Sequence, residues 1–78
     1  MLEEIPIREE TIRLGQLLKL AGIVDSGSEV KALLASEPAW VNEQPETRRG
    51  RQLHRGDSVR IGERRLLIAA APPPLDPS

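Results

Sequence analysis

The spacing of apolar residues changes at Ala39, and the change limits the folds open to this chain. Between Thr11 and Ala39 the pattern is helical, with Leu14, Leu17, Leu18 and Ala21 at positions i, i+3, i+4 and i+7. After Ala39 apolar and polar residues alternate, as they do in half-buried strands. A chain of 78 residues has room for one core, so both halves have to share it. The sequence therefore predicts an α+β domain, a helix pair packed on a small, mostly antiparallel sheet.

Both expected helices carry signals at their ends. The first is predicted to begin at Thr11 as its capping residue and to end just before Gly22. Gly15 lies inside it and costs about 1 kcal/mol against alanine, so we expect close packing or the close approach of a partner there. The second begins at Ser26-Gly27-Ser28-Glu29, a capping-box sequence, and ends before Pro38.

Short strands are predicted at residues 4–8, 39–42, 58–61 and 64–69. Pro6 cannot donate to a sheet ladder, which places the first strand at an edge. Turns are expected at 43–46, Gly56-Asp57 and Gly62-Glu63. Residues 71–78 hold four of the seven prolines and are predicted to be a disordered tail, which leaves 1–70 as the folded domain.

Composition excludes several classes of protein. The chain has no cysteine and a single histidine, His54, so it cannot build a disulfide scaffold or a Cys- or His-rich metal site. Its apolar runs are too short to cross a membrane, and its N-terminus has no signal-peptide core. No carboxylate pair lies in an apolar setting, and no glycine-rich turn precedes a serine. We therefore expect a cytoplasmic monomer without membrane, metal, cofactor or catalytic residues, and not an enzyme.

Charge is strongly segregated, although the net charge is only −1. Residues 1–10 carry −3, residues 11–47 carry −2, and residues 48–65 carry +5 from seven arginines against Asp57 and Glu63. Arginine, unlike lysine, grips phosphate with a planar fork and stacks on bases. Two interpretations of 48–65 stay open: a segment that contacts RNA, or a solvated face paired with the glutamates of 1–10.

The helices add polar residues to this picture. Arg13, Gln16 and Lys19 recur at i, i+3 and i+6 on the polar side of the first helix, and Lys31 lies near the start of the second. The N-terminus of the second helix, at Ser26, could receive a phosphate. Alternatively, Ser26 and Glu29 only cap that helix.

A longer set of residues, taken in order along the chain, resembles the sequence pattern of a known family. It reads Ile12-Arg13-Leu14, Leu17-Leu18-Lys19, Gly22, Ser26-Gly27, Val30-Lys31, Leu33-Leu34, Trp40-Val41-Asn42, Arg48-Arg49-Gly50, Leu53, Gly56-Asp57 and Val59. In this order the set resembles the S4 RNA-binding domain, over about residues 5–68. The small stand-alone bacterial branch of that family is the most similar, because it carries the pieces seen here as Leu17-Leu18-Lys19, Ser26-Gly27 and Arg48-Arg49-Gly50-Arg51.

The resemblance implies a surface on which the helix pair and the following loop contact structured RNA, usually ribosomal RNA, with ribosomal proteins as further partners. The residues it implies for RNA binding are Arg13, Gln16, Lys19, Ser26, Lys31, Asn42, Arg48, Arg49 and Arg51. The chain departs from the family pattern at Glu43, where glycine is usual, and at Glu37-Pro38. The alternative function is a protein-interaction module associated with the ribosome or an RNA-modifying enzyme.

Two further side chains have more than one interpretation. Trp40 is predicted to face the opposite side of its strand from Ala39 and Val41, where it either stacks on a base or, as is more common, covers a sheet face. His54 is interpreted as an RNA-facing or solvated group, and Asp57 as the residue that orders the adjacent turn.

Overall fold

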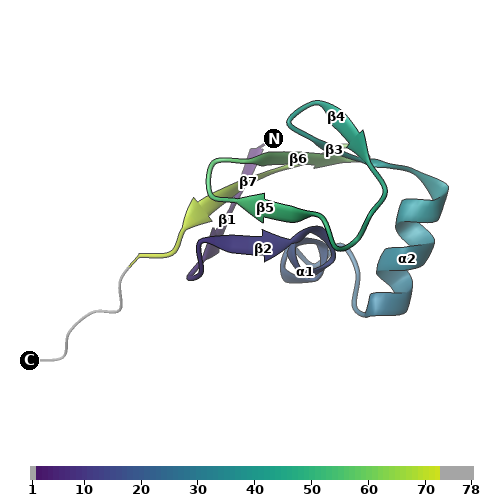
Figure 1. The fold of residues 1–78 in the computed structure, drawn as a ribbon, viewed down its shortest axis with the longest axis horizontal. Coiled ribbons are helices and arrows are strands. Elements are labelled where there is room, and N and C mark those ends of the chain that lie inside the picture. Colours follow the sequence, from purple (N-terminus) through teal and green to yellow (C-terminus); the bar gives the residue numbers. More distant parts are fainter. Residues whose placement is uncertain (1, 73–78) are drawn as a thin grey trace, which may run out of the picture.

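The computed structural model describes residues 2–72, which form two helices and seven strands (Figure 1). In chain order the elements are β1 (Leu2–Ile7), β2 (Thr11–Arg13), α1 (Leu14–Leu20), α2 (Gly27–Ser36), β3 (Ala39–Val41), β4 (Gln44–Glu46), β5 (Gln52–His54), β6 (Ser58–Ile61) and β7 (Arg64–Ala70). Most of the predicted proline-rich tail, residues 73–78, lies outside the described residues. The tail therefore stays a prediction.

Five strands form the main sheet in the order β1-β7-β6-β3-β4. Every neighbouring pair is antiparallel except β1 and β7, which run parallel with Pro6 opposite Ala69. β1 is an edge strand, as Pro6 predicted. β2 and β5 pair separately as a two-stranded antiparallel sheet. The predicted α+β class, with a helix pair and a mostly antiparallel sheet, is confirmed.

One core joins the main sheet, the helix pair and the small sheet. Alternate residues of β3, β6 and β7 face inward and are buried against the apolar stripe of α1, where Leu14, Leu17 and Leu18 have no exposed surface. α2 adds Val30 and Leu34, and β5 adds Leu53. This burial supplies the main driving force for folding, because each fully buried Leu or Val contributes about 1.5–3 kcal/mol.

The first helix begins later than predicted. Thr11 does not cap it, because Thr11–Arg13 pair with β5 as β2, and the Thr11 hydroxyl receives a hydrogen bond from Gln52 Nε2 at 3.2 Å. The capping position belongs to Arg13, with extended φ and ψ of −81° and 149°, and its backbone N–H donates to Gln16 Oε1 at 3.3 Å. A β-branched pair, Thr11-Ile12, is better placed in a strand than in a helical first turn.

The predicted turn at 43–46 is also wrong in part. Asn42 and Glu43, with φ of 49° and 70°, form the whole turn, and Gln44–Glu46 pair with β3 as β4. Pro45 favoured a loop in the sequence, but β4 is an edge strand and tolerates proline. The other turns are confirmed: Gly56 and Gly62 have positive φ, and Asp57 Oδ2 accepts a hydrogen bond from His54 N at 2.7 Å.

Candidate nucleic-acid interface

A groove runs between α1, α2 and the loop that connects β4 to β5. Its volume is about 280 Å³, and its lining is Arg13, Gly15, Gln16, Lys19, Gly27, Val30, Arg49 and Gly50. The polar side of α1 supplies Arg13, Gln16 and Lys19, which the sequence placed together by their spacing. Among the described residues, no acidic side chain lines this groove. It therefore offers three cations and one amide to a ligand.

Gly15 allows the groove to form. A Cβ at this position would lie 3.3 Å from Val30 Cγ1 and 3.4 Å from the Arg49 carbonyl oxygen. The backbone N–H of Gly15 donates to Arg49 O, and that of Leu14 donates to Arg51 O, both at 2.9 Å. Free N–H groups at the start of α1 are thus satisfied by the loop, which fixes the loop to the helix. The close packing expected at Gly15 is confirmed.

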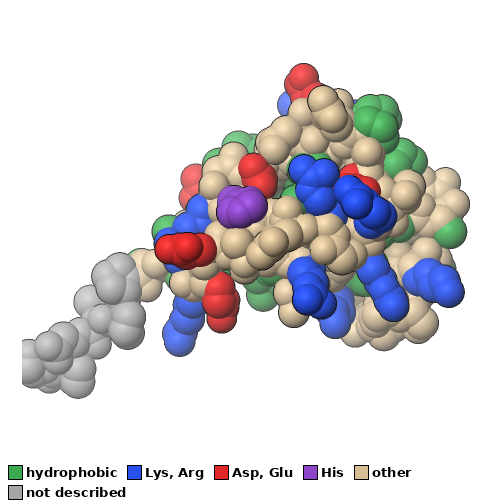
Figure 2. Space-filling view, viewed as in Figure 1, with side chains coloured by type: hydrophobic (Ala, Val, Ile, Leu, Met, Phe, Trp, Pro, Cys, Tyr) green, Lys and Arg blue, Asp and Glu red, His purple; other side chains and the backbone are tan. Residues whose placement is uncertain are grey.

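A second depression of about 310 Å³ adjoins the first, since Arg49 lines both. Its other lining residues are Lys31, Leu34, Ala35 and Thr47. Lys31 is exposed on α2 and adds a fourth cation to the surface formed by the two depressions. We call Arg13, Lys19, Lys31 and Arg49 the groove cations. Figure 2 shows Lys and Arg side chains gathered on the part of this face where the helices and the β4–β5 loop lie.

Glu46, which the sequence analysis did not single out, holds the loop. Its side chain is only 7% exposed and accepts five hydrogen bonds: from the backbone N–H of Thr47 and Arg48, from Arg48 Nε and Nη2, and from Arg51 Nη1, all at 3.0–3.1 Å. The side-chain bonds from Arg48 are the main reason that the pKa of Glu46 falls from 4.5 to about 2, although burial acts in the opposite direction. The sequence did contain a signal for this role, because Glu46 precedes Arg48 by two positions and Arg51 by five.

The three loop arginines therefore differ in their surroundings. Arg48 and Arg51 are each paired with Glu46 Oε1 at 3.0 Å, whereas Arg49 lines both depressions and has no ion pair among the described residues. The Arg48 side chain is still 75% exposed, and its guanidinium has hydrogen-bond donors that Glu46 does not use.

Two of the predicted contact residues have internal roles. The Ser26 hydroxyl caps α2 by accepting from Glu29 N at 3.3 Å, while Glu29 Oε2 accepts from Asp25 N, so the capping interpretation of this sequence is the one the geometry matches. Asn42 lies in the β3–β4 turn, away from the groove lining. Its Oδ1 accepts from Ser58 N and its Nδ2 donates to Asp57 Oδ1, which ties the turn to β6.

The remaining arginines of 48–65 do not extend this surface. Arg64 bonds both oxygens of Glu3, at 2.6 and 2.8 Å, and also the Ala21 carbonyl, and the pKa of Glu3 is lowered by its hydrogen bond to Arg64. Arg55 donates to the Arg8 carbonyl at 2.6 Å. Arg60 and Arg65 lie on the outer face of the main sheet. The arginines of 48–65 therefore do not form one continuous surface, and of the seven only Arg64 pairs with a glutamate of 1–10 among the described residues.

Over residues 2–72 no three His, Cys, Asp or Glu side chains gather closely enough to hold a metal ion. Neither helix of that range has the length and apolar character needed to cross a membrane.

A helix pair with a cationic groove, backed by a small sheet, defines an α+β RNA-binding domain. A sequence model of the S4 domain matches residues 5–69, so the chain belongs to the S4 domain family, as the ordered motif set predicted. The chain is similar to a Bacillus subtilis (strain 168) protein described as "Probable ribosome maturation protein RlbA", with 46% identity over 61 residues. That stretch is 78% of this chain and 86% of the relative, which is therefore also a small protein.

Proposed function

We propose that this protein binds structured ribosomal RNA through the groove and the β4–β5 loop, and that it acts in ribosome maturation. The observation that carries the proposal is the set of four groove cations on a surface whose described lining has no acidic residue. The relative's description as a ribosome maturation protein supports ribosomal RNA as the target.

Recognition rests on phosphate contacts. Arg13 and Arg49 present forks that can hold a phosphate with two hydrogen bonds, and Lys19 and Lys31 act as point charges. Gly15, Gly27 and Gly50 add no side chain to the groove lining, so an RNA backbone can approach closely at these positions. Because the loop is bonded to α1 and to Glu46 before RNA arrives, little ordering entropy is lost on binding.

This function needs no chemical step, and we assign no catalytic residue to the chain. A single copy presents the complete groove, which is consistent with a monomer that works in the cytoplasm beside the ribosome. Ribosomal proteins near the bound RNA are the expected protein neighbours.

The salt dependence of RNA binding tests the proposal. With total bacterial ribosomal RNA as the probe, we expect the plot of log affinity against log salt to have a slope of about −3, as four phosphate contacts would give. Replacing two groove cations, Lys19→Gln with Arg49→Gln, should halve that slope and weaken binding about tenfold or more. Arg8→Gln is the matched control, because Arg8 is exposed and lies outside the groove lining.

Absence of binding at low salt, or a slope near zero, would overturn the proposal. Arg8→Gln removes one charge and the double variant removes two, so a loss of log affinity in Arg8→Gln that reaches half of the loss in the double variant would show that only overall charge matters. Arg48→Ala is a poorer test, because it removes two of the side-chain hydrogen bonds to the Glu46 carboxylate and so lowers stability as well.

A further inference from the structure

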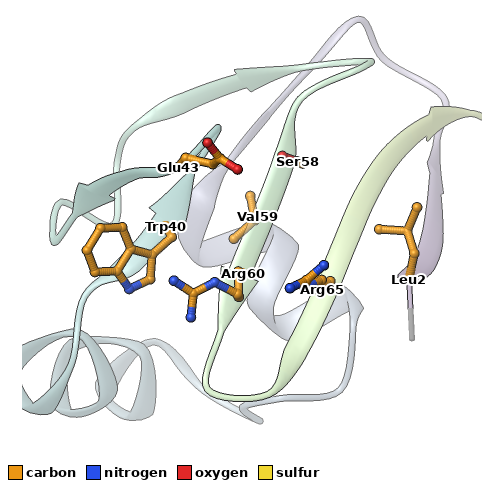
Figure 3. Close-up of a pocket in the computed structure, with 7 residues that line it drawn as sticks. All are labelled: Leu2, Trp40, Glu43, Ser58, Val59, Arg60 and Arg65. Atoms are coloured by element: carbon orange, nitrogen blue, oxygen red, sulfur yellow. The ribbon is translucent and has the colours of Figure 1, made fainter.

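The outer face of the main sheet carries a row of side chains that the groove does not use. Trp40 on β3 is directly opposite Arg60 on β6, Arg60 is opposite Arg65 on β7, and Arg65 is opposite Leu2 on β1. Directly opposed residues share a face, and Figure 3 shows these four side chains on the side of the sheet away from the helices. They line a shallow depression of about 230 Å³, with Glu43 and Ser58 at its rim.

This row is electrostatically unfavourable for the protein alone. Two like charges directly opposite each other on neighbouring strands destabilise a sheet. Among the described residues, neither Arg60 nor Arg65 forms an ion pair, in contrast to Arg48, Arg51 and Arg64. The one compensating contact is between the Arg60 guanidinium and the Trp40 ring, 5.2 Å from its centroid. The row therefore holds two cations next to an aromatic ring, and neither cation has an ion-pair partner among the described residues.

The chemistry of the row selects its ligand. Neighbouring strands lie about 4.8 Å apart, so the Arg60 and Arg65 guanidinium groups can reach the same phosphate. The half-buried Trp40 ring and the Arg60 plane are flat surfaces of the kind on which unpaired bases stack. Glu43 also lines the depression, and its carboxylate can accept a hydrogen bond from the amino group of a base.

We propose that the outer sheet face is a second RNA site, which binds an unpaired segment with a phosphate between Arg60 and Arg65 and a base against Trp40. The inference rests on the proposed function in that the ligand is RNA. The inference goes beyond the proposed function because the groove and the sheet face lie on different sides of the molecule. One protein would therefore hold two RNA segments. The structured part enters the groove and the single-stranded part crosses the sheet.

Trp40 makes this site directly observable, because it is the only tryptophan of the chain. Titration with the oligonucleotide U10 should quench its fluorescence, and the double variant Arg60→Gln with Arg65→Gln should weaken that binding about tenfold or more. Arg8→Gln, the matched exposed control, should bind U10 like the wild type. The melting temperature of the double variant should be equal to or above that of the wild type, because a like-charge pair is removed, and this excludes unfolding as the cause.

The outcomes separate the two proposals. If Lys19→Gln with Arg49→Gln loses ribosomal RNA but keeps U10 quenching, the sheet site is independent of the groove, as we infer. If U10 causes no quenching while the groove still binds ribosomal RNA, the sheet site is overturned and the proposed function stands.

If U10 quenches but ribosomal RNA does not bind with the expected salt slope, the groove proposal fails and the sheet site remains. Polyglutamate that quenches as strongly as U10 at the same salt would overturn the RNA assignment in favour of an acidic protein.

Discussion

At the scale of single residues, the Glu46 carboxylate has the largest influence on the candidate site. It lies almost buried beneath the β4–β5 loop and bonds two of the three loop arginines together with two backbone N–H groups. The Glu46 carboxylate orders the loop and also neutralises part of the positive charge that the loop arginines carry. The loop is therefore held in one shape, while Arg49 keeps its full charge for a ligand.

Glu46→Gln should destabilise the protein by about 1.5–3 kcal/mol at pH 7, because hydrogen bonds to a charged acceptor are lost. The pKa of Glu46 is about 2 in the folded protein and 4.5 ordinarily, so the unfolded chain binds the proton more readily. The stabilisation is complete above about pH 5 and is lost as the pH falls through about 2. Urea denaturation at pH 7, 4 and 2.5 should show that the difference in the free energy of unfolding between Glu46→Gln and the wild type becomes smaller as the pH falls.

The matched control for this experiment is Glu10→Gln. Glu10 is exposed, and the described structure gives its side chain no hydrogen bond or ion pair, so its effect should stay within about 0.5 kcal/mol at each pH. A Glu46→Gln deficit that is the same at all three pH values would contradict the role assigned to the charge.

At the scale of elements, short connections decide where the functional side chains lie. The β3–β4 turn takes two residues with positive φ, Asn42 and Glu43, a conformation that matches the twist of a hairpin. Asn42 is well suited to it, because its side chain bonds β6. Glu43 is not, since a side chain with a Cβ costs about 1–2 kcal/mol in the left-handed region. The resemblance to the S4 domain led us to expect glycine here, and the turn forms with Glu43 in the left-handed region instead.

Glu43→Gly should therefore stabilise the protein by about 0.5–1 kcal/mol, after the greater flexibility of glycine in the unfolded chain is subtracted. Thermal denaturation measures the change. Gly62→Ala is the reciprocal control, because Gly62 has a φ of 58° in the β6–β7 turn and alanine should lower the melting temperature. If Glu43→Gly lowers it as well, strain at Glu43 is not the controlling factor.

At the scale of the whole molecule, the two sheets and the helix pair depend on one small core. A domain of this size has a total stability of about 4–12 kcal/mol. Leu53 shows the dependence well, since it lies in the two-stranded sheet, pairs with Ile12 of β2, and is completely buried in the common core. Loss of the Leu53 side chain should therefore destabilise the whole domain and not only β5.

Leu53→Ala should cost about 2–5 kcal/mol and lower the melting temperature by roughly 8 °C or more. Circular dichroism and tryptophan fluorescence should report one coincident transition, because Trp40 lies on a different sheet from Leu53. Gln52→Ala, an exposed neighbour with one side-chain hydrogen bond, is the control and should cost less than about 1 kcal/mol. Two separate transitions in Leu53→Ala would mean that the two sheets unfold independently.

Much of the fold was predictable because its signals are local. The apolar stripe of α1, the cap at Ser26, the glycines after α1 and in the β6–β7 turn, and the edge proline each depend on residues a few positions apart. The spacing of Arg13, Gln16 and Lys19 likewise placed them on one side of the groove. One error came where pairing is distant: Thr11–Arg13 form a strand only because β5, about 40 residues later, lies beside them. The other came at β4, where Pro45 favoured a loop although an edge strand tolerates it.

The sequence by itself determined the class of fold, the shared core and the excess of arginine in the second half, since periodicity and composition are properties of the chain. Only the tertiary structure decided which arginines are available to a ligand. Arg64 meets Glu3, 61 positions away, Arg55 meets the backbone of β1 and the residue after it, and Arg60 and Arg65 are brought together by strand register. The physical reason is that the free charge of a side chain depends on its partners in space, and folding chooses those partners from the whole chain.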